Sequence, residues 1–135
     1  MKRFLIYWLP VVALCTFIFV QSAFPSPDVL SGWPFSDKFA HAGAYGLLAF
    51  LLGRAFSTVG RLQRNPVWLW ALSVVLSTLY GLSDEWHQSF VAARTADAAD
   101  LLADAVGAAA GAWIWLKVRL RFKDFPHPGK NSAHD

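Results

Sequence analysis

Cysteine, methionine and charge are all scarce in this chain of 135 residues. The single Cys15 and the single methionine exclude a disulfide framework and a thiolate metal cluster. Charged residues make up only 16% of the chain, against about 25% in average soluble domains, so a water-facing surface could hardly be covered. Hydrophobic residues make up 56%, which excludes intrinsic disorder. The composition predicts one small integral membrane domain, residues 1–125.

Four segments are nearly free of charge and long enough to cross a membrane, at about residues 4–20, 39–56, 66–82 and 101–118. At about 1.5 Å per residue, each spans about 26 Å, close to the roughly 30 Å hydrocarbon core of a bilayer. Four such helices cannot all be buried within so small a protein. The sequence therefore predicts an all-α membrane bundle of four helices, followed by a disordered cytoplasmic tail at 126–135.

The positive charges predict the orientation, because they concentrate in cytoplasmic loops. Ten of the twelve Lys and Arg fall on the side that holds both termini, and only Lys38 and Arg94 fall on the other. Most acids show the opposite bias. We therefore expect a multi-pass protein with both termini in the cytoplasm. Its basic side would contact anionic lipids rather than nucleic acid.

The first segment has a second interpretation as a cleaved signal peptide. Lys2 and Arg3 would supply the basic region, and Val20-Gln21-Ser22 a tolerable cleavage site. The apolar stretch is longer than the roughly 7–15 residues of a signal peptide, which favours a retained anchor. Cleavage would leave three spans with the same sidedness.

Polar residues at the outer boundary are candidates for a functional site, because ionisable groups are costly in or beside a span. One group contains Asp37, Lys38, His41 and Tyr45, and positions 37, 41 and 45 share a helix face. Asp104 lies a full turn inside the fourth segment, where a lone charge costs about 2.5–3.5 kcal/mol. Its expected partner is Lys38, Arg94, His41 or a bound ligand, unless it is protonated. The second group as a whole contains Asp84, Glu85, His87, Gln88, Arg94, Asp97, Asp100 and Asp104.

Several of these patterns also have a structural interpretation. Gly107-x-x-x-Gly111 predicts close helix packing. His41 with Tyr45 fits an interhelical hydrogen bond as well as a site, and Asp84-Glu85 fits a solvated loop. Histidines with several aspartates could hold a divalent cation, but no tight ligand motif such as His-Glu-x-x-His is present. No metal and no cofactor is therefore predicted.

Three motifs taken together resemble the VanZ-like family of small membrane proteins. They cover roughly residues 36–112, and their specificity comes from their combination and order. At Asp104 the family often has Asn, and before Arg94 it often has Pro where this chain reads Val91-Ala92-Ala93. The motifs read Asp37-Lys38-x-x-His41-x-x-x-Tyr45, Tyr80-Gly81-x-x-Asp84-Glu85-x-x-Gln88-x-Phe90 and Arg94-x-x-Asp97-x-x-Asp100-x-x-x-Asp104-x-x-Gly107.

The family is named for a protein associated with low-level resistance to teicoplanin-type glycopeptides, and it has no established biochemical activity. The resemblance implies a cell-envelope role in the inner membrane of a bacterium. It supplies no catalytic residues.

We expect the outward-facing polar pocket to bind an envelope ligand and to contribute to low-level glycopeptide resistance. The candidate ligands are a lipid-linked cell-wall precursor, a lipid headgroup and the glycopeptide itself. Lys38 and Arg94 would pair with phosphate, and the acids and Gln88 with amines, hydroxyls or amides.

Two other functions fit the same residues. In the first, the chain is a membrane hydrolase or transferase acting on a lipid-linked phosphate, with His41 or His87 beside carboxylates as general base. In the second, the polar residues only hold the helices together. The sequence does not decide between binding and catalysis, and it leaves the oligomeric state open.

Overall fold

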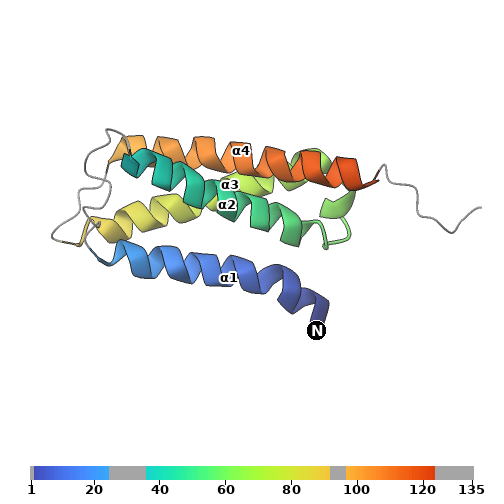
Figure 1. The fold of residues 1–135 in the computed structure, drawn as a ribbon, viewed down its shortest axis with the longest axis horizontal. Coiled ribbons are helices and arrows are strands. Elements are labelled where there is room, and N and C mark those ends of the chain that lie inside the picture. The colour runs from blue at the N-terminus through green and yellow to red at the C-terminus, as the bar shows by residue number, and fades with distance from the viewer. Residues whose placement is uncertain (1, 25–35, 92–96, 124–135) are drawn as a thin grey trace, which may run out of the picture.

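The computed structural model describes residues 2–24, 36–91 and 97–123, and these ranges form helices joined by turns, without a strand. The elements are α1 (Lys2–Ser22), α2 (Ser36–Phe56), the short 3-10 helix η2 (Leu62–Arg64), α3 (Pro66–Gln88) and α4 (Ala98–Lys123). Consecutive long helices run in opposite directions along one bundle axis (Figure 1). All four are long and apolar enough to cross a membrane. The all-α bundle predicted from the sequence is therefore confirmed.

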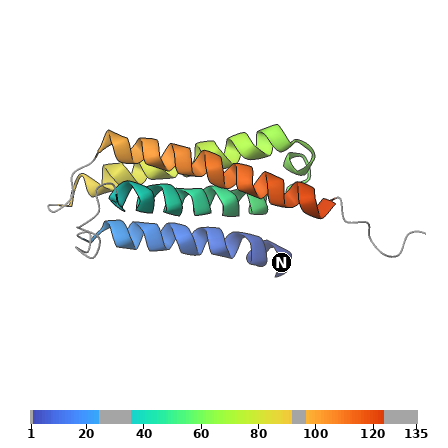
Figure 2. The same cartoon turned by 45° about the horizontal axis from the view of Figure 1, so that its top comes forward.

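The four helices do not contribute equally to the interior. α2 packs most extensively on α4, α3 packs on both, and α1 lies at the edge against α2 and α3 (Figure 2). The largest apolar core lies where α1 meets α2, around Val11, Ile18, Tyr45, Leu48 and Leu52. Because α1 shares this core, it is part of the packed unit.

Large apolar side chains cover the outside of the bundle. Phe4 and Phe17 of α1, Val67 and Trp68 of α3 and Leu102 of α4 are each at least 60% exposed. Apolar side chains so widely spread over the outside of a bundle are unsuited to water. Helices also satisfy their own backbone hydrogen bonds, as lipid requires. This exterior supports the reading of the helices as membrane spans.

Glycines bring the backbones of α2 and α4 into contact. A Cβ atom on Gly46 would lie 2.9 Å from the carbonyl oxygen of Gly107. A Cβ on Gly107 would collide with the backbone of Ala42, and one on Gly111 with the backbone of Gly46. The packing role predicted for Gly107 and Gly111 is confirmed, because only glycine allows this approach.

The helix boundaries agree with the sequence at the start of α3 and differ at its end. Asn65 caps α3 by accepting hydrogen bonds from the backbone N–H groups of Val67 and Trp68, with Pro66 at the first position. The predicted apolar span ends near residue 82, and the helix α3 continues beyond it to Gln88. Likewise α4 begins at Ala98 rather than near 101. The proposed tail at 126–135 lies outside the described residues.

The two ends of the bundle differ in chemistry. At one end, called the polar end below, α1 and α3 finish and α2 and α4 begin, and the acidic residues gather there. The opposite, basic end holds Arg54, Arg61, Arg64 and Lys117. Arg54 is tied there to α1, with its guanidinium 4.6 Å from the centre of the Tyr7 ring.

Replacing Gly107 with Ala is expected to destabilise the bundle by about 1–3 kcal/mol, because the new methyl group overpacks the α2–α4 contact. Gly43→Ala is the matched control, since a Cβ on Gly43 meets nothing within 4 Å. That control should be neutral or stabilising, because Ala favours helix more than Gly does. Thermal unfolding in detergent micelles measures both. Equal effects of the two substitutions would contradict the described packing.

Candidate functional site

Acidic side chains from three of the helices meet at the polar end. Asp37 lies on α2, Asp84 and Glu85 on α3, and Asp100 and Asp104 on α4. Four of these five are buried, with exposed fractions of 5% for Asp84, 6% for Glu85, 6% for Asp100 and 0% for Asp104. Burial of a carboxylate costs free energy unless donors satisfy it. The hydrogen-bond donors to these carboxylates are therefore described one by one below.

Lys38 ties the start of α2 to the start of α4. Its Nζ donates to Asp97 Oδ2 at 2.9 Å and to Asp100 Oδ1 at 2.7 Å. Asp97 also accepts a hydrogen bond from the backbone N–H of Ala99, so it caps α4. The Ala99 N–H and the Lys38 ammonium hold the pKa of Asp97 below its usual value. The expected phosphate partner Lys38 is thus engaged by two carboxylates.

Asp104 and His41 form a buried pair between α4 and α2. His41 Nδ1 lies 3.0 Å from Asp104 Oδ1. Of the partners expected for Asp104, the described structure gives His41. Gly81 of α3 makes room for this carboxylate, because a Cβ there would lie 2.5 Å from Asp104 Oδ2. Oδ2 itself is buried and has no hydrogen-bond partner among the described residues.

Asp84 connects α3 to α1. Its Oδ1 accepts a hydrogen bond from the hydroxyl of Ser22 at 2.5 Å, and its Oδ2 accepts one from Gln88 Nε2 at 2.9 Å. Sequence reasoning missed Ser22 as a site residue. The sequence feature that could have indicated Ser22 is a small polar residue at the end of an apolar run. The same feature also fits a signal-peptide cleavage site.

Glu85 and Tyr45 are also buried between the helices. Glu85 Oε2 accepts a hydrogen bond from the backbone N–H of Asp97 at 3.1 Å, whereas buried Oε1 has no partner within the described ranges. The burial of Glu85 and Asp84 excludes the solvated-loop interpretation of this pair. The Tyr45 ring stacks on His41, with centroids 6.1 Å apart, and its buried hydroxyl has no hydrogen-bond partner among the described residues.

One predicted site residue, His87, does not join this cluster. The His87 ring turns away to α1 and stacks on Phe19, with centroids 4.5 Å apart. Asp84 and Gln88 lie on the buried face of α3. His87 lies at the edge of that face and is half-buried. Arg94 lies outside the described residues. The described residues that the structure does bring together at the polar end are Asp37, Lys38, His41, Tyr45, Asp84, Glu85, Gln88, Asp97, Asp100 and Asp104.

These features define a multi-pass helical membrane protein with an acid-rich cluster at one end of its bundle. A family model described as VanZ/LLP1 matches residues 4–121, which include all four candidate spans. The chain belongs to this family, as the three sequence motifs indicated. No curated protein and no solved structure matches the chain.

Ser22→Ala is expected to lower the free energy of unfolding by about 1–3 kcal/mol, because it leaves a buried carboxylate oxygen of Asp84 without its donor. Thr16→Ala is the control on the same helix. Thr16 is exposed, and among the described residues its hydroxyl bonds only to the carbonyl of Val12 in its own helix, so its replacement should change stability by no more than about 0.5 kcal/mol. Unfolding of the purified protein in micelles measures both. A Ser22→Ala effect no larger than that of the control would show that this contact does not hold α1.

Proposed function

We propose that this protein sits in the inner membrane of a bacterium with its polar end facing outward. There it binds a cell-envelope ligand and contributes to low-level resistance to teicoplanin-type glycopeptides. The observation that carries the proposal is the pair of buried carboxylate oxygens, Glu85 Oε1 and Asp104 Oδ2, which lack donors among the described residues. Buried acceptors of this kind call for a ligand or water to satisfy them.

The charge distribution supports the orientation. The basic end carries the arginines of the α2–α3 connection and of α4, and the positive-inside tendency places such an end in the cytoplasm. The polar end then faces the periplasmic or cell-wall side, where glycopeptides act on envelope precursors. Both termini lie in the cytoplasm in this arrangement.

The hydrogen bonds at the polar end favour a ligand that donates hydrogen bonds. The carboxylates outnumber the one lysine of the described cluster, and that lysine already contacts Asp97 and Asp100. A ligand recognised here would therefore present amines, amides or hydroxyls to the acids. Lipid-linked cell-wall precursors, amine-bearing lipid headgroups and glycopeptides all carry such groups. Recognition of a phosphate by Lys38 alone would require breaking two ion pairs.

Expression of the protein in a susceptible bacterium is expected to raise the inhibitory concentration of teicoplanin. Glu85→Gln should return it to the empty-vector level, because the amide removes the charge that attracts a cationic donor group. Asp124→Asn, an acid replacement beyond the described helices, is the matched control and should retain resistance. Membrane levels of each variant are measured in parallel.

Two results would count against the proposal. The first is unchanged teicoplanin sensitivity when correctly inserted wild-type protein is present. The second is full resistance with Glu85→Gln. If Glu85→Gln loses resistance and also loses thermal stability, the result favours the assembly role instead.

The position of His41 also fits the alternative that the protein is an enzyme. Its ring is oriented by the Asp104 carboxylate, as a general base often is. Turnover of a polyprenyl phosphate by the purified protein, lost in His41→Ala, distinguishes a hydrolase or transferase from a binding protein.

A further inference from the structure

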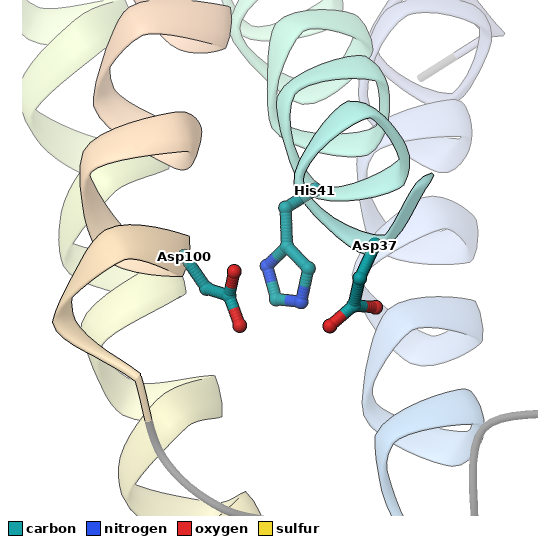
Figure 3. Close-up of side chains that lie close together, drawn as sticks. All are labelled: Asp37, His41 and Asp100. Atoms are coloured by element: carbon teal, nitrogen blue, oxygen red, sulfur yellow. The ribbon is translucent and has the colours of Figure 1, made fainter. Parts of the chain in front are cut away.

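Three side chains able to bind a metal ion lie close together at the polar end, where α2 and α4 begin. Asp37 and His41 lie one turn apart on α2, and Asp100 faces them from α4 (Figure 3). One ligand atom from each lies within 4.8 Å of the other two. Asp37 is exposed, so a small rotation of its carboxylate allows all three atoms to reach one ion at the usual distance of about 2.0–2.2 Å.

The contacts of His41 orient its ring for this role. A carboxylate only accepts hydrogen bonds, so the contact with Asp104 places the proton of a neutral imidazole on Nδ1. The lone pair is then on Nε2, which has no hydrogen-bond partner among the described residues. The His41 ring is nine-tenths buried and lies between the carboxylates of Asp37 and Asp100. Metal-binding histidines are usually held in this way by a carboxylate on the other nitrogen.

The local charge also calls for a cation. Among the described residues, Lys38 pairs with Asp97 and Asp100, Asp37 lies beside Asp100 and His41, and buried Asp104 contacts His41. Lys38 donates to Oδ1 of Asp100 and thereby fixes this carboxylate, whose second oxygen has no other bonded partner in the described helices. Within the described ranges, four carboxylates thus gather with one lysine.

We propose that Asp37, His41 and Asp100 form a binding site for one divalent transition-metal ion, with Asp104 as the residue that positions His41. A mixed set of one imidazole and two carboxylates suits Mn²⁺ or Zn²⁺ better than Mg²⁺ or Ca²⁺, which prefer oxygen alone. Three protein ligands leave coordination positions open for water or a ligand oxygen. The site goes beyond the proposed function, because ion binding requires no envelope ligand.

The test uses the full-length protein in lipid nanodiscs, purified with a tag that contains no histidine. His127 and His134 are replaced by Ala in every sample, so that they cannot bind the metal. Mn²⁺ binding is followed by the loss of the electron paramagnetic resonance signal of the free ion, and Zn²⁺, Mg²⁺ and Ca²⁺ are added as competitors. One bound ion per chain is expected, displaced by Zn²⁺ and only weakly by Mg²⁺ or Ca²⁺.

The variants assign the ligands. His41→Ala, Asp100→Asn and Asp37→Asn should each weaken binding at least about tenfold, and Asp104→Asn by roughly 10–100-fold, as for other residues that orient a ligand. Asp37 is exposed, so Asp37→Asn keeps the packing intact and tests the site even if a buried variant fails to fold. Asp84→Asn removes the same charge from a buried carboxylate bonded to Ser22 and Gln88, and it should bind Mn²⁺ like the parent protein.

Three results would overturn the proposal. These are no saturable binding of Mn²⁺ or Zn²⁺, unchanged affinity in Asp37→Asn, and an equal loss in Asp84→Asn, which would indicate diffuse charge attraction. Loss of teicoplanin resistance has no part in this test. The metal site and the proposed function can therefore fail independently.

Discussion

The contact between Asp104 and His41 is the interaction on which the polar end of the bundle depends. Asp104 is completely buried, so its carboxylate needs a hydrogen-bond donor. The donor comes from α2 because the glycines of α2 and α4 let the two backbones touch. A wider spacing between α2 and α4 would separate His41 from Asp104 and leave a buried carboxylate without its partner. Close packing and the buried pair are thus parts of one arrangement.

Asp84 and Asp100 likewise accept a hydrogen bond from a side chain of another helix, and Asp84 also accepts one from Gln88 of its own helix. Lys38 of α2 holds Asp97 and Asp100 at the start of α4, and Ser22 of α1 holds Asp84 of α3. Polar contacts between helices in lipid are individually modest, at roughly 1 kcal/mol each. Their concentration at one end leaves the remaining bundle to apolar and small side chains. The same concentration creates a surplus of acceptors that an ion or a ligand would satisfy.

The sequence predicted the parts of this fold that depend on local composition. Four apolar runs, Asn65-Pro66 at the start of α3 and the glycines of α4 all follow from short-range rules. The sequence did not predict the features that depend on contacts between helices. Asp84, Glu85 and Gln88 have the composition of a loop, yet α3 continues through them because partners from α1 and α4 bury them. For the same reason the roles of Ser22 and of Lys38 could not be predicted, and the metal site joins residues on two helices without any short motif.

A double-mutant cycle on His41 and Asp104 tests the central claim most directly. The free energy of unfolding is measured in micelles for the parent, His41→Ala, Asp104→Ala and the double variant. The structure predicts strong non-additivity, about 0.5–3 kcal/mol, with the double variant more stable than the sum of the single changes allows. The reason is that His41→Ala alone leaves Asp104 buried and unpaired. Additive effects within about 0.5 kcal/mol would mean that the two side chains do not meet, and the account of the polar end would be wrong.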